Sequence, residues 1–448
     1  MHVTSRSEWA LDRSYTMAQV TPVADPISGR ITVPGSKSYT NRALIIAALA
    51  TGTSKLKGIL RSDDSYWCID ALRRLGVSID VDGDEVTIQG TGGEWPTDKG
   101  ELFIGAAGTI ARFLPGALAV KSSGQWTVDG IEQLRKRPLR PLIDGLKSLG
   151  ADITSLSESE GLPLVVKGTG LSGGTVQVPG NVSSQFLSGL LIASACARDK
   201  VTINVIGGLV QPAYIGITLQ LMRAFGAHIQ HDEDYTTFTV HPTGYEARDT
   251  VLEADASTAC YFLSVAALTQ GTVRIENVGY HSHQPDAKFI DVLQRMGCQT
   301  VKHDTYLEVT GPKQLRGGFE VDMKPMSDQA LTVGALAPFA DKPITVTNVA
   351  HIRKHESDRI AVICQALANM GLNVEENTDG FTVYPGDLHG AKLDPHDDHR
   401  NAMVFALLGL KVPDIQILDP ACVSKTCPTF FSELKKLGID VTLTKSTV

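Results

Sequence analysis

The sequence predicts an α/β protein built from six copies of one unit, with three copies in each of two domains. Two observations support this fold class. An amphipathic helix that ends in glycine and leads into a β-strand recurs six times, and a second, almost wholly apolar helix recurs in phase with it. The chain has 448 residues, which is enough for two or three domains of ordinary size.

The first recurring helix is recognised by its ending. In each copy Leu, Ile, Met or Phe recur at helical spacing, and a glycine follows where a left-handed C-cap is expected. The six glycines are Gly76, Gly150, Gly226, Gly297, Gly371 and Gly438, and subtraction gives intervals of 74, 76, 71, 74 and 67 residues. Such a unit is too long for a thin solenoid repeat, and three of them fit one globular domain.

The second recurring element is a polar cluster, then a helix of small and apolar residues, then a β-rich stretch. These helices are apolar on nearly every side, so they should be buried. The strands after them carry β-branched residues and end in turn-forming residues. The polar clusters begin at Ser36, Gly108, Ser183, Ala256, Ser327 and Asp398.

A boundary near residue 253 divides the six units three and three. We expect an N-terminal domain over 34–253 and a C-terminal domain over 254–448. Residues 1–33 are expected to form an N-terminal extension and a first strand that joins the C-terminal domain. We expect the first 16 residues to be disordered or extraneous to the fold.

Composition narrows the function classes. Hydrophobic residues make up 42% and charged residues 20%, an ordinary globular balance. The net charge of −8 argues against a general nucleic-acid or anionic-membrane surface, although a local basic cleft remains compatible with it. No apolar run approaches the length of a membrane span, and the first residues lack the apolar core of a signal peptide.

The cysteines and the absence of cofactor motifs point to a cytoplasmic protein without prosthetic groups. The cysteines are odd in number, scattered and free of any C-x-x-C pair, so we expect reduced thiols and no zinc site. No metal-ligand cluster and no nucleotide motif occurs, so we expect no cofactor. The seven are Cys68, Cys196, Cys260, Cys298, Cys364, Cys422 and Cys427.

The chemistry of the chain is concentrated at the starts of the apolar helices. A helix N-terminus exposes unpaired N–H groups and a partial positive charge, which favours anions. Capping alone explains Ser257. It explains Lys37, Arg42 and Arg400 poorly, because a basic residue near a helix start opposes the dipole at a cost of roughly 0.3–1 kcal/mol. A bound anion would remove this conflict, so we expect one electropositive chamber at these starts.

The strongest local motif is VPGSKSYTNRALIIAAL, over 33–49. A Pro-Gly turn precedes a helix that opens with Ser-Lys-Ser, and Arg42 lies four residues after Ser38 on the same face. Lys37, Ser38 and Arg42 can therefore converge on one anionic ligand. The motif is not a P-loop, because the G-x-x-x-x-G-K spacing is absent.

This run and several others resemble the EPSP synthase family over about residues 20–448. The others are GAAGTIARFLPGAL, RKRPLRPLID, NVSSQFLSGLL, EADASTACYF, SDQALTVGALA, HESDRI, DDHRNAM and DPACVSKTCP, in the family's order and spacing. The resemblance implies a two-domain inside-out α/β barrel of βαβαββ units, whose helix N-termini face an inter-domain cleft. It also implies transfer of the enolpyruvyl group of phosphoenolpyruvate to the 5-hydroxyl of shikimate 3-phosphate, with release of phosphate, in the shikimate pathway of aromatic amino acid biosynthesis.

The resemblance also assigns substrate contacts. For shikimate 3-phosphate it implies Lys37, Ser38, Arg42, Ser183, Ser184, Gln185, Gln211, Tyr214, Asp328 and His355. For phosphoenolpyruvate it implies Lys37, Gly108, Thr109, Arg137, Gln185, Glu356, Arg359, Arg400 and Lys425. Taken singly, each Ser could be an ordinary cap and each Arg a surface residue. Arg135, Lys136 and Arg140 are expected to be of the solvated kind.

The reaction needs the acceptor hydroxyl deprotonated and the vinyl carbon protonated, and carboxylates among cations can do both. We assign Asp328, with Lys37, to the acceptor hydroxyl. Glu356 and Lys425 are assigned to the vinyl carbon, and His399 is a further catalytic candidate. From the residues alone, Asp328 could instead be an N-cap, and the E-S-D-R stretch could be an i,i+3 pair on a helix.

Four positions depart from the commonest residues of the family. Ala106 replaces Asn, Gln211 replaces Ser, His351 replaces Asn and His355 replaces Lys. We expect the loss of the Asn donor at Ala106 to weaken binding of glyphosate, which mimics phosphoenolpyruvate in this family.

Three other functions are weighed against this one. The sister enzyme, UDP-N-acetylglucosamine 1-carboxyvinyltransferase, usually carries a reactive Cys in a loop that corresponds to about 121–137, and no Cys occurs there. A paralogue with another phosphorylated acceptor would use Gln211 and His355 differently. A non-catalytic anion-binding protein would not need Asp328 and Glu356 among cations. We expect small-molecule substrates, no nucleic acid or membrane partner, and a monomer.

Overall fold

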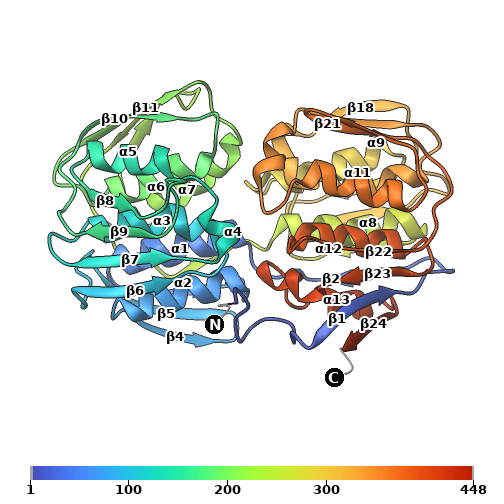
Figure 1. Ribbon diagram of the computed structural model, residues 1–448, viewed down its shortest axis with the longest axis horizontal. Helices are drawn as coiled ribbons and strands as arrows, with labels where there is room; N and C mark the ends of the chain where they lie inside the picture. The colour runs from blue at the N-terminus through green and yellow to red at the C-terminus, as the bar shows by residue number, and fades with distance from the viewer. Residues whose placement is uncertain (1–3, 446–448) are drawn as a thin grey trace. The chain divides into compact units, whose positions relative to one another are not determined.

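The chain forms two compact units in the computed structural model, which describes residues 4–445. One unit contains Gly35–Leu252 with the segment that ends at Glu8, and the other contains Trp9–Pro34 with the residues from Glu253 onward. In each unit the apolar helices lie in the interior and the sheets at the periphery (Figure 1). The described residues form six four-stranded sheets, one for each predicted repeat.

The first unit contains three of the repeats. Its first repeat comprises α1 (Lys37–Leu49), β3 (Thr51–Lys57), α2 (Asp63–Arg74), β4 (Ser78–Asp82) and β5 (Glu85–Thr91). The second comprises β6 (Lys99–Phe103), α3 (Gly108–Ala119), β7 (Gln125–Asp129), α4 (Glu132–Arg135), α5 (Arg140–Ser148), β8 (Asp152–Ser155) and β9 (Leu164–Lys167). The third comprises β10 (Gly174–Pro179), α6 (Ser184–Ser194), β11 (Val201–Ile206), α7 (Pro212–Ala224), β12 (Ile229–His231) and β13 (Thr237–Val240), and β14 (Thr250–Val251) follows it.

The second unit repeats this plan. Its first repeat comprises β2 (Gly29–Ile31), α8 (Ala256–Thr269), β15 (Thr272–Ile275), the 3-10 turn η1 (Pro285–Lys288), α9 (Phe289–Arg295), β16 (Gln299–Lys302) and β17 (Leu307–Thr310). The second comprises β18 (Phe319–Asp322), η2 (Lys324–Gln329), α10 (Ala330–Leu336), η3 (Ala337–Phe339), β19 (Ile344–Thr347), η4 (Ala350–Lys354), α11 (Arg359–Asn369), β20 (Val374–Asn377) and β21 (Gly380–Val383). The third comprises β22 (Ala391–Leu393), α12 (His399–Gly409), β23 (Ile415–Leu418), η5 (Pro420–Lys425), α13 (Phe430–Lys436), β24 (Val441–Lys445) and, from the start of the chain, β1 (Tyr15–Val20).

All six sheets share one strand order. The first two strands of a repeat pair in parallel, and the last two pair antiparallel beside them, as in the order β6-β7-β9-β8. Three sheets are completed by a strand from a distant part of the chain: β14 pairs with β3, β2 pairs with β15, and β1 lies between β23 and β24. The predicted βαβαββ plan is thus confirmed, with three strands supplied from outside their own repeat.

The predicted glycine ending is confirmed in every repeat. Each of the six glycines has a positive φ between 86° and 97°. The amide of the next residue donates back to a carbonyl five positions earlier, as from Val77 to Leu72 and from Ile439 to Leu434. This is the Schellman motif, and only glycine adopts its left-handed C′ position without steric cost.

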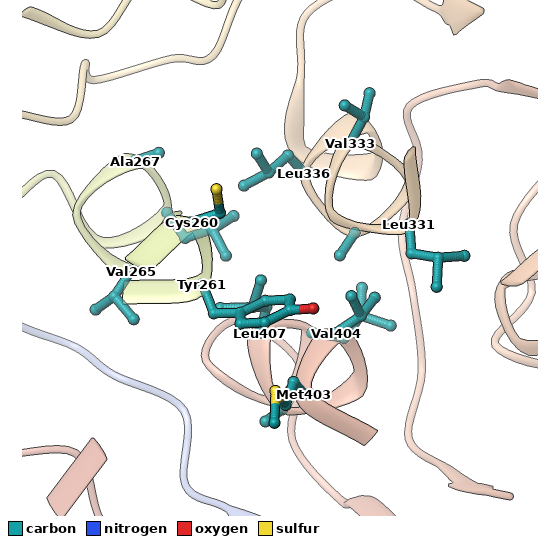
Figure 2. Close-up of a cluster of buried hydrophobic side chains, with 14 of the residues drawn as sticks. Cys260, Tyr261, Val265, Ala267, Leu331, Val333, Leu336, Met403, Val404 and Leu407 are labelled. Atoms are coloured by element: carbon teal, nitrogen blue, oxygen red, sulfur yellow. The ribbon is translucent and has the colours of Figure 1, made fainter. Parts of the chain in front are cut away.

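The helices predicted to be buried form the core of each unit. In the second unit α8, α10 and α12 face one another, and Figure 2 shows Tyr261, Leu331 and Leu407 among the side chains that pack between them. Full burial of a side chain of this size contributes roughly 1.5–3 kcal/mol.

The segment before β1 differs from expectation. The backbone N–H of Ser7 donates to Asp63 Oδ1 of α2 over 2.7 Å, and Arg6 Nη1 lies 3.5 Å from Asp63 Oδ2. Trp67 Nε1 of the same helix donates to the carbonyl of Ser5 over 2.6 Å. Leu11 then donates to Ser424 Oγ in η5. The expectation that this segment is disordered or extraneous is therefore wrong for its described residues.

Candidate active site

In the first unit, Arg42 ties four helices together near their N-terminal ends. Its Nε donates to Thr218 Oγ1 of α7 over 2.7 Å, its Nη2 to Ser188 Oγ of α6 over 3.4 Å, and its Nη1 to the carbonyl of Ser38 over 3.0 Å. Its guanidinium also lies over the ring of Phe113 of α3. Each of these positions falls within two turns of its helix start, so α1, α3, α6 and α7 begin at the same end of the unit.

This arrangement has a consequence for Arg42 itself. Arg42 is 2% exposed, and burial lowers its pKa to about 10. The sequence motif predicts that Arg42 converges with Lys37 and Ser38 on one ligand. In the structure its guanidinium donates into the protein, and it organises the helix starts on which Lys37 and Ser184 lie.

The start of α3 has the features of an anion site. Its N-cap, Ala107, provides no side-chain acceptor, so the first amides lack that partner. A Cβ on Gly108 would lie 2.6 Å from Arg137 Nη1, so the Arg137 guanidinium rests directly against this glycine. Among the described residues the Arg137 side chain has no hydrogen-bond or ion-pair partner. An unpaired guanidinium against a helix N-terminus favours an anion there.

Two further helix starts carry predicted acceptor contacts. At α6 the hydroxyl of Ser183 caps the helix by accepting from the N–H of Gln185 over 3.2 Å, and Ser184 is buried. At α7 the residue before the helix, Gln211, has a left-handed backbone with φ 54° and ψ 57°. Tyr214 lies in the first turn of α7.

The second unit contains a denser set of charges, centred on Arg359. This side chain is 1% exposed and donates five hydrogen bonds. Asp398 accepts from Nε at 2.8 Å and from Nη2 at 3.2 Å, Asp328 accepts from Nη1 at 2.7 Å, and Glu356 accepts from Nη2 at 2.9 Å. His355 Nδ1 takes the fifth at 3.1 Å. Burial alone would lower the pKa of Arg359, but the three carboxylates outweigh this effect and raise the pKa above its usual value.

Asp328 links this cluster to the start of α12. Its second carboxylate oxygen lies 3.0 Å from Arg400 Nη2, and Arg400 Nη1 donates to the Tyr261 hydroxyl of α8 over 3.1 Å. Burial would lower the pKa of Arg400, but Asp328 raises it well above the usual value. Asp328 is thus held between two guanidinium groups, with each oxygen paired to a different arginine.

Glu356 makes the corresponding link to η5. Its Oε1 lies 3.2 Å from Lys425 Nζ, while its Oε2 accepts from Arg359. The exposed fractions of the Lys425 and Glu356 side chains are 5% and 11%. A carboxylate and an ammonium group at this distance can exchange a proton once a ligand changes the surrounding charge.

The histidines lie around this network. His399 is buried at the first position of α12, with Nδ1 3.6 Å from Asp398 Oδ1. His351 Nε2 is 2.9 Å from Ser327 Oγ, and burial lowers the pKa of His351. His355 approaches Asp328 to 3.9 Å and contacts Arg359. The second unit therefore brings Asp328, His355, Glu356, Arg359, His399, Arg400 and Lys425 into one cluster.

The structure excludes two alternative roles, one for Asp328 and one for the Glu356–Arg359 pair. Asp328 is not an N-cap: it lies in the 3-10 turn η2, and α10 begins two residues later. The Glu356–Arg359 pair exists, but Glu356 precedes α11, whose cap is Asp358, so it is not a pair on a helix face. Arg135, Lys136 and Arg140 have exposed side chains, as predicted.

Sequence reasoning missed several residues of the cluster. Asp398 caps α12 by accepting from the N–H of Arg400 and also chelates Arg359, but the only sequence signal is an aspartate before a helix. Tyr261 and Gln329 read as ordinary helix residues. The cations of this unit are balanced within the protein, since Arg359, Arg400 and Lys425 are each paired with a protein carboxylate.

No group of three or more His, Cys, Asp or Glu side chains between residues 4 and 445 could hold a metal ion. Over the same range, no helix has the length and hydropathy needed to cross a bilayer.

Comparison with known proteins places the chain in a family. The family profile of EPSP synthase (3-phosphoshikimate 1-carboxyvinyltransferase) matches residues 22–434. The chain belongs to the EPSP synthase family. A relative from Halalkalibacterium halodurans, named 3-phosphoshikimate 1-carboxyvinyltransferase 2, is 51% identical over 441 residues, which covers 98% of each chain. A relative from Trichormus variabilis, named 3-phosphoshikimate 1-carboxyvinyltransferase, is 39% identical and covers 92% of this chain and 97% of its own length.

Two solved structures agree with the fold. EPSP synthase from Acinetobacter baumannii superimposes with a TM-score of 0.80 at 26% identity, over 95% of this chain and 100% of that one. The enolpyruvyl transferase NikO from Streptomyces tendae gives a TM-score of 0.75 at 16% identity, which shows a shared fold. The expected inside-out α/β fold of the EPSP synthase family is thereby confirmed. The chain is accordingly a transferase of this family.

Proposed function

We propose that this protein transfers the enolpyruvyl group of phosphoenolpyruvate to the 5-hydroxyl of shikimate 3-phosphate and releases phosphate. The observation that carries the proposal is the 51% identity, over 98% of both chains, to a relative named 3-phosphoshikimate 1-carboxyvinyltransferase 2. The charged cluster of the second unit supports it, because both acid–base candidates lie there among cations. The reaction belongs to the shikimate pathway of aromatic amino acid biosynthesis.

Asp328 is proposed to accept the proton of the acceptor hydroxyl. Two guanidinium groups fix the orientation of its carboxylate, with Arg359 on one oxygen and Arg400 on the other. A carboxylate offers about four lone-pair positions, so a hydroxyl can still donate to it while both arginines stay bound. Lys37, at the first position of α1, is proposed to assist as a positive group at the acceptor.

Glu356 and Lys425 are proposed to handle the proton at the methylene carbon of phosphoenolpyruvate. In the addition step the acceptor oxygen bonds to the substituted vinyl carbon, and a proton from this pair bonds to the methylene carbon. In the elimination step the same carbon loses a proton and the carbon–phosphate oxygen bond breaks, which releases phosphate. The 3.2 Å contact between Lys425 Nζ and Glu356 Oε1 gives the proton a path between the two groups.

The anionic groups of the substrates are proposed to bind at arginines and helix starts. Arg137 with the first amides of α3 is proposed for phosphoenolpyruvate, because this guanidinium is unpaired and Gly108 leaves room for close approach. Arg359 already donates five hydrogen bonds, so direct binding of phosphoenolpyruvate there requires that a protein acceptor be displaced. Ser183, Ser184 and Gln185 are proposed to bind the acceptor phosphate.

Phosphate release from a mixture of phosphoenolpyruvate and shikimate 3-phosphate tests the proposal. We expect turnover that needs both substrates and falls at least about 100-fold in Asp328→Asn and Glu356→Gln, the usual scale for general acid–base groups. Arg135→Ala, which alters an exposed residue, is the matched control. No release with the purified wild-type protein, but release with another phosphorylated acceptor, would indicate a paralogous transferase instead.

We further propose that the enzyme acts as a cytoplasmic monomer. Its seven cysteines support a reducing compartment, because none of them forms a disulfide bond and six are buried. Light scattering during gel filtration at micromolar concentration should give the mass of one 48.0 kDa chain. A concentration-independent mass of two chains would contradict the monomer.

A further inference from the structure

Asp286, in η1, is a buried carboxylate to which the proposed mechanism gives no role. It is 2% exposed. Its Oδ2 accepts from Ser257 Oγ over 2.6 Å and from Gln329 Nε2 over 2.8 Å. Its Oδ1 is buried and has no hydrogen-bond partner among the described residues. A buried polar atom without a partner is destabilising, so Asp286 is costly to keep for stability alone.

The contacts of Asp286 close a ring through the starts of three helices. Gln329 follows Asp328 in the chain, and Asp328 pairs with Arg400 of α12. Arg400 in turn donates to the hydroxyl of Tyr261, which lies on α8. Ser257, which bonds Asp286, also lies on α8. Asp286 thus closes the ring, because it bonds both Gln329, the neighbour of Asp328, and Ser257 of α8.

The ring also places charges around Asp286. Burial, and after it the neighbouring Asp328, raise the pKa of Asp286 to about 6, while Arg400 and the hydrogen bonds from Ser257 and Gln329 oppose the shift. Across the elements that pack against it, α8 presents Asp255 and Cys260, η2 presents Asp328, and α12 presents Arg400. Asp286 and Asp328 therefore compete for the same positive group.

We propose that Asp286 is a positioning residue for Asp328: it holds the amide of Gln329 so that Asp328 stays against Arg400, and its negative charge makes Asp328 a stronger base. The inference rests on the proposed function, in which Asp328 deprotonates the acceptor hydroxyl. The Asp286 side chain thus has two effects on Asp328: it bridges Ser257 and Gln329, and it carries a negative charge. Different substitutions can remove these two effects separately.

Asp286→Asn removes the charge and keeps an oxygen that can accept from both Ser257 and Gln329. Asp286 and Asp328 repel each other, so the pair takes up its first proton at a higher pH than Asp328 alone would. Loss of the Asp286 charge removes this repulsion, so the acidic limb of the kcat/KM profile for shikimate 3-phosphate should move to lower pH by about one unit. Gln329→Met keeps the volume and removes the bridge. Its kcat should fall about ten- to hundredfold, with the acidic limb in place and the KM for phosphoenolpyruvate within about threefold.

A second readout does not depend on turnover. In protein labelled with ¹³C at the aspartate carboxyl groups, the resonance that disappears in Asp328→Asn identifies Asp328. This resonance should titrate at lower pH in Asp286→Asn than in the wild type. Asp291→Asn, which removes a partly exposed carboxylate paired with Lys302 in the same unit, is the control and should leave both the resonance and the pH profile in place.

The outcomes separate the two ideas. If Asp286→Asn leaves the Asp328 titration unchanged, or if both variants lower only the urea midpoint while kcat and pH profile match the wild type, the positioning role is overturned. If the wild-type protein releases no phosphate from the two substrates, the proposed function fails, and the titration of Asp328 still decides whether Asp286 controls it.

Discussion

Replacement of Asp398 by Ala should destabilise the second unit strongly while leaving its core intact. Asp398 is fully buried and accepts hydrogen bonds from Arg359 Nε at 2.8 Å, Arg359 Nη2 at 3.2 Å, Ser357 Oγ at 2.9 Å and the N–H of Arg400 at 3.1 Å. Alanine removes a helix cap and the bidentate partner of a buried guanidinium in one step.

The magnitude follows from these contacts. Loss of the α12 cap costs about 1 kcal/mol. Removal of one partner of a buried ion pair costs about 3–5 kcal/mol when the other charge is left uncompensated. Arg359 keeps Asp328 and Glu356 at 2.7 and 2.9 Å, so the loss there should lie near or below the lower limit. We therefore expect a total of about 3–4 kcal/mol, or roughly 6–16 °C in Tm for a unit of this size.

Urea unfolding followed by circular dichroism measures this loss in the transition of the second unit. Asp398→Asn should cost less than Asp398→Ala, because it keeps an oxygen for the cap. Asp387→Ala, at an exposed position, should stay within about 0.5 kcal/mol of the wild type. A midpoint for Asp398→Ala that matches the Asp387→Ala control would refute the view that this carboxylate secures Arg359 and α12.

Three further predictions concern other parts of the chain. Arg137→Ala should raise the KM for phosphoenolpyruvate about tenfold or more with little change in Tm, because the guanidinium has no protein partner to lose among the described residues. Arg140→Ala, the control, should change neither the KM for phosphoenolpyruvate nor Tm. Gly108→Ala should have the same effect as Arg137→Ala, because its Cβ would lie 2.6 Å from the Arg137 guanidinium. Burial lowers the pKa of His351, so its neutral form is favoured in the fold, and its contribution to stability is lost as pH falls from about 6.5 through the lower folded pKa. Urea midpoints between pH 7.5 and 5.5 should therefore fall less in His351→Gln than in the wild type, and parallel curves would contradict this. Arg6→Ala should lower stability by about 1 kcal/mol through loss of its partly buried pair with α2, and an unchanged midpoint would show that the pair contributes nothing.

Local signals in the sequence were enough to predict the repeats and their boundaries. Each repeat ends its amphipathic helix with a glycine that must adopt a left-handed backbone, so Gly76 and Gly438 could be identified without tertiary information. Burial of α1 and α12 followed from helices that are apolar on every side. The family motifs placed Lys37 at the start of α1 and Asp328 shortly before α10.

Tertiary structure alone decided how the charges are shared. Arg359 and Asp398 are 39 residues apart, and no local spacing indicates that one carboxylate both caps α12 and chelates the arginine of α11. Arg42 reads as a ligand-binding residue from its place on α1, and only the structure shows that it also donates to α6 and α7. Ion pairs between helix ends depend on packing over distances that a sequence pattern of period 3.6 does not record, whereas caps and buried faces are fixed by neighbours along the chain.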